Sequence, residues 1–74
     1  MVSMEREALA KISEMGRPVP YKTIANKMEI GTEYGRLICN SLGRADYIDI
    51  DIKGICRITP KGKNFLESEQ KGVS

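Results

Sequence analysis

The sequence contains no histidine, no tryptophan and no glycine-rich phosphate-binding loop. Histidine is the commonest general base and a frequent zinc ligand, so its absence removes the central residue of most catalytic dyads and zinc sites. A chain of 74 residues is also too short to build a substrate pocket beside its core. We therefore expect no enzyme and no catalytic residues, and likewise no metal site, no cofactor and no small-molecule ligand.

Long apolar runs are also absent, and the first fifteen residues contain three glutamates. A membrane span needs about 20 apolar residues, and a secretory signal needs an apolar core. The sequence predicts neither of them. We expect a cytoplasmic protein without a membrane partner, folded as one small domain.

The two cysteines, Cys39 and Cys56, do not form a CxxC pair. Both fall at positions that we expect to face the core, one on a helix and one on a strand. The favoured interpretation is that both are reduced and act as small buried hydrophobes. A redox pair stays open as the alternative, because the helix and the strand should pack together.

Positive charge is modest and unevenly distributed. The formal net charge is +2. Residues 17–44 contain five basic and two acidic side chains, whereas residues 1–16 contain two basic and three acidic ones. The positive excess in the middle of the chain favours a polyanionic partner.

Residues 21–48 show two amphipathic helices, 21–28 and 33–45, separated by a sharp bend and followed by a strand. We expect Gly31 to supply the turn conformation, and either Gly31 or Thr32 to cap the second helix.

A glycine inside a helix often marks the close approach of another backbone. We therefore expect Gly35 to pack against Ala25 where the two helices cross. The alternative is that Gly35 lies in a frayed first turn and packs on nothing.

The flanking segments complete the domain. A helix is expected over residues 4–15, capped by Ser3 and ended by a left-handed Gly16. The two prolines of residues 17–20 favour a short edge strand. Thr59 should cap a last helix that packs on the first one through Phe65 and Leu66. The domain is predicted to span residues 1–67, with a flexible tail at 68–74.

A hairpin is predicted over residues 47–59, and its register follows from burial. A two-residue loop would pair Ile50 with Arg57 and place a charge in the core. A three-residue loop, residues 52–54, instead pairs Ile50 with Cys56 and Ile48 with Ile58. It also pairs Asp49 with Arg57 as a cross-strand ion pair, gives Gly54 the left-handed position, and leaves Ile52 and Lys53 exposed at the tip.

This order predicts an α+β fold of the winged helix-turn-helix type: a three-helix core with a short edge strand, a two-stranded wing and a short C-terminal helix. The chain resembles that superfamily, and is similar to the core of multiple-antibiotic-resistance-type regulators and to small archaeal winged-helix DNA-binding proteins. The resemblance covers about residues 5–67. It is carried by the apolar positions between Ile24 and Ile48 and by the closing segment from Ile58 to Glu67.

The resemblance implies a transcriptional regulator that places the helix 33–45 in the major groove of double-stranded DNA. Arg36 would grip a guanine edge and Asn40 an adenine edge, while Lys53 would approach a neighbouring groove. The other expected DNA contacts, mainly to phosphates, are Arg17, Lys22, Thr23, Thr32, Tyr34, Ser41 and Arg44.

Some features favour a different partner. Asp49 and Asp51 on the wing and Glu33 on the helix would repel phosphate, and the aliphatic Leu37 and Ile52 are expected to be exposed. The alternative function is a winged-helix protein–protein interaction module without DNA readout. That module would serve in dimerisation or as an assembly subunit. For the regulator a homodimer is expected, since proteins of this type commonly bind two-fold symmetric sites.

Overall fold

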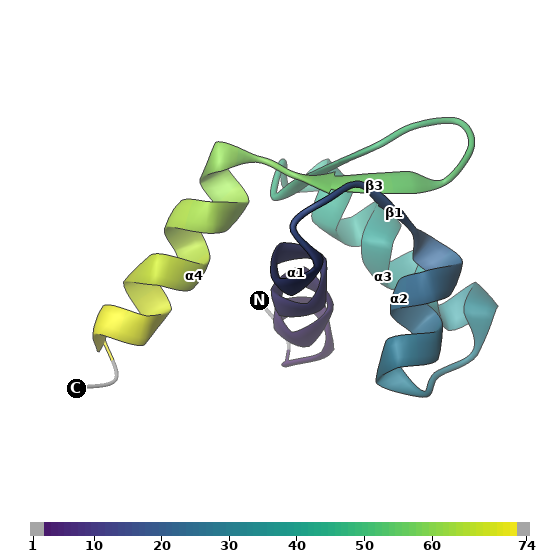
Figure 1. The fold of residues 1–74 in the computed structure, drawn as a ribbon, viewed down its shortest axis with the longest axis horizontal. Helices are drawn as coiled ribbons and strands as arrows, with labels where there is room; N and C mark the ends of the chain where they lie inside the picture. The colour runs from purple at the N-terminus through teal and green to yellow at the C-terminus, as the bar shows by residue number, and fades with distance from the viewer. Residues whose placement is uncertain (1–2, 73–74) are drawn as a thin grey trace.

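A computed structural model describes the backbone of residues 3–72 and the side chains of residues 4–68. Within this range four helices and one three-stranded antiparallel sheet form the predicted α+β arrangement. The elements are α1 (Ser3–Met15), β1 (Val19–Pro20), α2 (Tyr21–Met28), α3 (Thr32–Arg44), β2 (Ile48–Ile50), β3 (Ile55–Ile58) and α4 (Pro60–Gly72). Helix α1 lies between α4 and the α2–α3 pair, and the sheet covers one end of the helices (Figure 1). None of these helices is long and apolar enough to cross a membrane.

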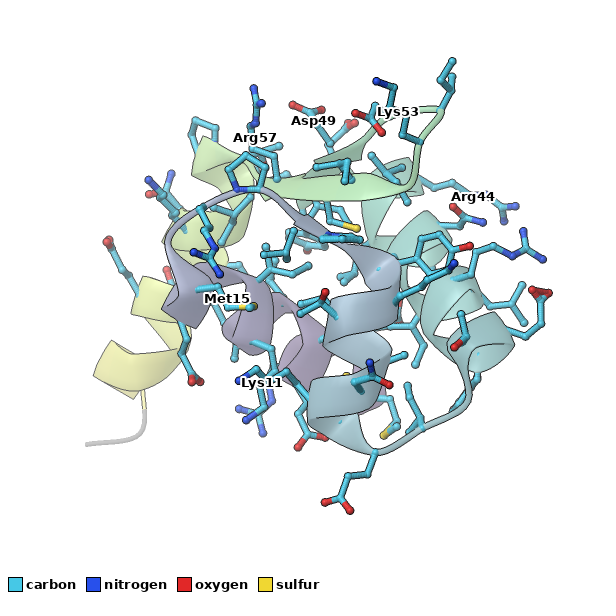
Figure 2. All side chains as sticks on the ribbon, turned by 45° about the vertical axis from the view of Figure 1, so that its right-hand side comes forward. Lys11, Met15, Arg44, Asp49, Lys53 and Arg57 are labelled. Atoms are coloured by element: carbon cyan, nitrogen blue, oxygen red, sulfur yellow. The ribbon has the colours of Figure 1, made fainter. Side chains whose placement is uncertain are left out.

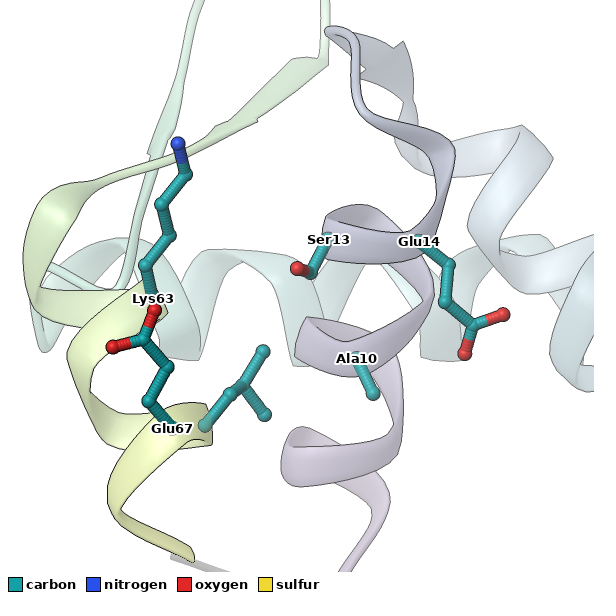
Figure 3. Close-up of a pocket in the computed structure, with 6 residues that line it drawn as sticks. Ala10, Ser13, Glu14, Lys63 and Glu67 are labelled. Carbon is teal, nitrogen blue, oxygen red and sulfur yellow. The ribbon is translucent and has the colours of Figure 1, made fainter. Parts of the chain in front are cut away.

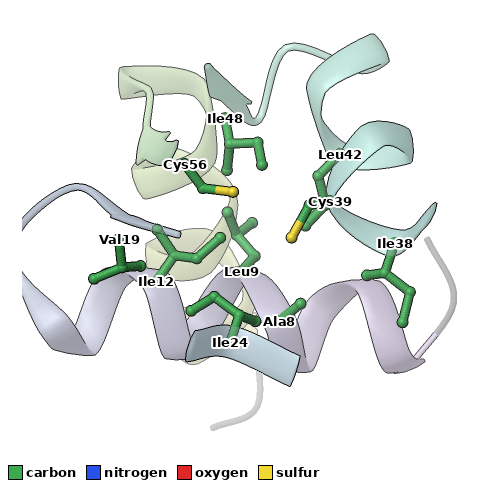
Figure 4. Packing of buried hydrophobic residues seen from close by; sticks show 10 residues of the cluster. All are labelled: Ala8, Leu9, Ile12, Val19, Ile24, Ile38, Cys39, Leu42, Ile48 and Cys56. Atoms are coloured by element: carbon green, nitrogen blue, oxygen red, sulfur yellow. The ribbon is translucent and has the colours of Figure 1, made fainter. Parts of the chain in front are cut away.

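One apolar cluster joins α1, α2, α3 and the sheet, as Figure 4 shows. Its fully buried side chains come from the stripes that helical and strand periodicity predict. They include Leu9, Ile12, Ile24, Leu42 and Ile48. Removal of their apolar surface from water is the main force that holds so small a domain together.

Both cysteines belong to this cluster as free, fully buried thiols, as predicted. The Cys56 thiol donates a long hydrogen bond, 3.8 Å, to the carbonyl oxygen of Gly54. Its hydrogen bond with Cys39 and its burial raise the pKa of the Cys56 thiol well above the usual range. Cys56 is therefore a protonated thiol at neutral pH, which is the poorly reactive form.

The hairpin has the predicted three-residue loop and register. Ile48 is paired with Ile58, Asp49 with Arg57, and Ile50 with Cys56. Gly54 adopts a left-handed φ of 84°, and Ile52 is fully exposed at the tip. The predicted ion pair was wrong: Asp49 and Arg57 face each other by register, but these two described side chains form no salt bridge. Both are exposed to water, where such a pair contributes little energy.

The short segment after α1 forms the predicted edge strand. Gly16 ends α1 with a left-handed φ of 64°. Val19 is then buried, and Pro20 follows it as β1 pairs antiparallel with β3 in the sheet order β1-β3-β2. Proline is tolerated here because one side of β1 has no neighbouring strand.

The bend between α2 and α3 turns at a different residue from the one expected. Glu29 takes the left-handed conformation, with φ 57° and ψ 43°, and its N–H and that of Ile30 bond back to α2 carbonyls. Gly31 has an extended φ of −64° and caps α3, so its conformational freedom is not needed for the turn. Helix α2 ends with a hydrogen bond to the Ala25 carbonyl. This bond requires the residue that directly follows α2, Glu29, to be left-handed, because the chain must reverse at the last turn of the helix.

The crossing of α2 and α3 depends on the predicted contact between Gly35 and Ala25. Gly35 is buried, and a Cβ atom added to it would lie 2.6 Å from the Ala25 Cβ. That separation is too short for two carbon atoms, so α3 can reach α2 this closely because position 35 has no side chain. The alternative of a frayed first turn without contacts is excluded.

The start of α4 is fastened to the end of α3. Thr59 caps α4 by accepting the Gly62 N–H (3.2 Å) and donates its hydroxyl to the Asp46 carbonyl (2.6 Å). Phe65 packs against the Tyr47 ring, with centroids 5.3 Å apart. Lys61 binds the Ala45 carbonyl at the C-terminal end of α3 (2.7 Å), where a cation is favourable.

Helix α4 ends later than expected. It runs to Gly72, past position 67 where the sequence predicts the domain to end. Glutamate, glutamine and lysine, which favour helices, account for much of residues 67–71. Residues 73–74 of the predicted flexible tail lie outside the described residues.

Replacing Gly35 with alanine should destabilise the fold by about 1–3 kcal/mol, because overpacking against Ala25 outweighs the better helix propensity of alanine. Chemical denaturation of wild type and Gly35→Ala measures the difference. The double variant Gly35→Ala/Ala25→Gly should recover part of the loss, since it moves the methyl group to the other helix.

Gly31→Ala is the matched control. Nothing lies within 4 Å of its added Cβ and its φ is ordinary, so we expect a change within about 0.5 kcal/mol. Equal stability of Gly35→Ala and wild type would contradict the contact.

Candidate functional site

Two open hollows lie between the outward side of α3 and the β2–β3 hairpin. They share Asn40 and Ile50. We call the two together the α3–hairpin groove. Its lining residues are Tyr21, Arg36, Asn40, Gly43, Arg44, Ile48, Asp49, Ile50, Asp51, Ile52, Lys53 and Gly54.

The α3 wall of the groove is formed by one stripe of polar side chains. Arg36, Asn40 and Arg44 are spaced by four residues, so they lie one above another along the helix. Their stripe lies away from the buried positions Ile38 and Leu42. Figure 2 shows Arg44 and Lys53 on the same side of the molecule, with Arg57 toward the other end of the sheet. The groove therefore has arginines on its α3 wall, and Lys53 beside Asp49 and Asp51 on its hairpin wall.

Arg36 is held by Glu33. The Arg36 Nε–H donates to Glu33 Oε1 (3.0 Å) and an Nη2–H donates to Oε2 (2.7 Å). The hydrogen bonds and charge of Arg36 lower the pKa of Glu33, and the same contacts raise the pKa of Arg36. Both side chains stay substantially exposed, with 42% and 77% of the Arg36 and Glu33 side-chain surfaces accessible. The pair therefore contributes little to stability but orients the guanidinium.

The hairpin tip owes its shape to Asp51. The Oδ1 atom of this side chain accepts the backbone N–H groups of Lys53 (2.9 Å) and Ile55 (3.0 Å). An aspartate that closes its own turn in this way is a common device in tight loops. Asp51 therefore has a structural role that sets the direction of Lys53, although its charge also lies beside the groove.

Tyr21 connects the hairpin to the start of α2. Its ring lies so close to Gly54 that a Cβ atom there would meet the ring at 2.5 Å, and its N–H donates to the Gly54 carbonyl (3.0 Å). Tyr21 also lines the groove beside Arg36. Sequence reasoning did not include Tyr21 among the site residues.

Four other predicted site residues occupy the surface around the two helices. Thr32 and Tyr34 are exposed in the first turn of α3, and Lys22 is exposed at the start of α2. Thr23 is half-buried beside Lys22. None of the four lines the α3–hairpin groove.

Ser41 is half-buried at the edge of the outward surface, and its hydroxyl has a partner within the protein. Its hydroxyl donates a short hydrogen bond to the Glu5 carboxylate on α1. Position 41 lies on the border between the buried and exposed sides of α3, and helix α1 packs along that border. The contact joins residues 36 apart in sequence, so local pattern gave no signal for it.

Arg17 is placed away from the groove. It lines a separate hollow with Arg57 and Lys63, above Ile12 and Ile58. Lys63 also borders the neighbouring hollow between α1 and α4, where Figure 3 shows its side chain extending away from Glu67. The structure thus does not bring Arg17 together with the α3 residues.

Metal binding has no support from the side chains at 4–68, where no group of three or more Cys, Asp and Glu residues is arranged to hold an ion.

The Glu33–Arg36 pair was missed by sequence reasoning, which considered Glu33 solely as a repulsive charge. The three-residue spacing of the two on one helix was the available signal.

Comparison with known proteins adds no relative: no protein-family model matches this chain, and no curated protein matches it. The function must therefore be argued from the residues themselves.

Replacing Arg36 with alanine should raise the pKa of Glu33 back toward that of an ordinary glutamate, because the hydrogen bonds and the opposite charge are removed together. In wild type the lowered pKa means that the pair is intact at neutral pH and is lost as the pH falls through that pKa. NMR titration of the Glu33 side-chain carboxyl measures both values. Leu37→Ala is the control and should leave the lowered pKa in place; an unchanged pKa in Arg36→Ala would refute the ion pair in solution.

Proposed function

We propose that the protein is a winged-helix DNA-binding protein, a transcriptional regulator that places α3 in the major groove. The observation that carries this proposal is the stripe of Arg36, Asn40 and Arg44, which shares one groove with Lys53 of the hairpin. In this stripe Arg36 and Asn40 are half-buried and Arg44 is exposed. Arginine and asparagine side chains at one-turn spacing suit the width and the hydrogen-bonding pattern of the major groove.

The arrangement of elements supports the proposal. Helices α2 and α3 follow each other through a short bend, as in a helix-turn-helix, and the β2–β3 hairpin would act as the wing. Because Tyr21 packs on Gly54, the hairpin is attached to the helix pair that it would assist. The recognition helix and the wing can then meet DNA as one rigid surface.

The residues divide into two roles. Arg36 and Asn40 lie in the middle of α3 and would contact base edges, guanine and adenine respectively. Arg44, Lys53, Lys22, Thr23, Thr32 and Tyr34 surround them and would contact phosphates. Ser41 and Arg17 are left out of this interface, because the first is bound to Glu5 and the second lines another hollow.

Exposed apolar side chains favour a second candidate, a protein–protein interaction module. Tyr34 and Leu37 on α3 are 48% and 57% exposed, and Ile52 is fully exposed at the hairpin tip. Apolar side chains of this size on a surface often mark protein contacts.

Titration of labelled random duplex DNA at about 50 and 200 mM salt tests the main proposal, because neutralised phosphates release counterions. With three cationic side chains on phosphates, Lys22, Arg44 and Lys53, the logarithm of the binding constant should fall with the logarithm of the salt concentration with a slope of about −3. Arg44→Ala should reduce that slope by about 1, since it removes one phosphate contact. Absence of binding at low salt would eliminate the DNA function.

Leu37→Ala separates the two candidate functions. If α3 reads DNA, this variant should bind duplex DNA as wild type does, whereas Arg36→Ala should bind more weakly. If α3 is a protein-contact surface, Leu37→Ala should change the oligomeric state in sedimentation experiments, and Arg36→Ala should not. DNA binding that responds to Leu37 and ignores Arg36 would contradict the proposed groove geometry.

A further inference from the structure

The Glu33–Arg36 pair leaves a defined part of the Arg36 side chain free. A guanidinium carries five N–H donors. Glu33 engages Nε–H and one Nη2–H, which form the side edge of the group. Both Nη1–H groups and the second Nη2–H remain free. The end edge of the guanidinium therefore presents two donors, one N–H of Nη1 and one N–H of Nη2. Two parallel donors at this spacing match the O6 and N7 acceptors of guanine.

The pair also changes what Arg36 attracts. A free arginine beside DNA is drawn to phosphate, which is the strongest source of non-specific affinity. With Glu33 bound to it, the combined charge of the two side chains is close to zero, and the carboxylate itself repels phosphate. What remains favourable is a directional hydrogen-bonding contact, and such a contact depends on the base rather than on the backbone.

Position on the helix supports a base contact. Arg36 and Glu33 lie in the first half of α3, and Asn40 follows Arg36 by one turn on the same stripe. Four residues of helix rise about 6 Å, which corresponds to about two base steps. Arg36 and Asn40 can therefore address two nearby base pairs of one site.

We propose that Glu33 is a positioning residue that sets the sequence specificity of α3: it fixes Arg36 so that its free edge reads guanine, and it keeps Arg36 from pairing with phosphate. This inference rests on the proposed DNA-binding function. Glu33, the acid at the start of α3, then no longer counts against DNA binding. It weakens non-specific binding and thereby raises the discrimination between DNA sequences.

A plain structural role makes a different prediction. Glu33 lies in the first turn of α3, where a negative charge is favourable for the helix. In that case its removal would lower stability and weaken binding to every duplex equally. The preference for guanine at one position is therefore the readout that separates positioning from helix stabilisation.

The experiment uses the whole chain and a pool of random duplex DNA, from which bound molecules are recovered and sequenced. Wild type should select guanine at one position by about fivefold or more, with a preferred adenine about two base pairs away. Glu33→Gln should lose most of the guanine preference and keep the adenine preference. It should also bind unselected duplexes more tightly, with a salt slope steeper by about 1, because Arg36 becomes free to contact phosphate.

Two variants provide matched controls. Glu29→Gln removes the same charge from the neighbouring bend without touching Arg36, so it should keep the guanine preference of wild type. Arg36→Lys keeps the positive charge but lacks the fork, so it should lose the guanine preference as Glu33→Gln does. Circular dichroism checks that each exposed substitution leaves the helix content unchanged.

The outcomes are distinguishable. A Glu33→Gln variant that selects guanine as strongly as wild type overturns the positioning role and leaves the proposed function standing. Equal loss of affinity for all sequences in this variant likewise overturns the positioning role and leaves the proposed function standing. If wild type binds no duplex even at low salt, the proposed function fails and the positioning role fails with it.

Discussion

The close contact between Gly35 and Ala25 is the constraint on which the surface of this protein depends. It allows α3 to cross α2 with its backbone nearly touching a neighbouring side chain. Any side chain at position 35 would push the helices apart and change which residues of α3 face solvent. The same crossing brings the start of α2 toward the hairpin, where Tyr21 packs against Gly54. One small residue on α3 and one on the hairpin thus set the distance between the two walls of the α3–hairpin groove.

Two of the acidic residues near the groove have local partners, whereas Asp49 is exposed on its hairpin wall. The Asp51 carboxylate accepts two backbone N–H groups of its own loop, and Glu33 holds Arg36. An acid bound in this way repels an approaching anion less than a free carboxylate, because nearby donors balance part of its charge. The low net charge of +2 is therefore compatible with a groove that attracts polyanions at particular points.

The end of α3 is held as firmly as its crossing with α2. Gly62 lies so close to the Tyr47 carbonyl that an added Cβ atom would be 2.3 Å from the oxygen. Around this contact, Thr59 and Lys61 bind the carbonyl groups that the end of α3 leaves free. The segment Thr59–Pro60–Lys61–Gly62 therefore acts as a cap for two helices at once. Arg44 is the last residue of α3, so its backbone is held in place by this junction.

The sequence by itself determined the α+β order, the hairpin register and the Gly35–Ala25 contact. The order and the register follow from local periods and from the burial of apolar side chains, and the contact follows from a glycine inside a helix. The same reasoning identified Arg36, Asn40 and Lys53 as exposed polar residues, but it did not show that they share one groove. DNA binding itself stays a proposal.

Tertiary structure alone decided the details that join distant segments. Ser41 forms a hydrogen bond with Glu5 because α1 packs along the border of α3. Arg17 lines a hollow with Arg57 and Lys63 because three segments of the chain meet there. The left-handed turn fell on Glu29, because closing α2 required it two residues before Gly31. Periodicity says which side of a helix is buried, but a residue at the border takes its partner from whichever element packs beside it. That neighbour is set by the whole fold.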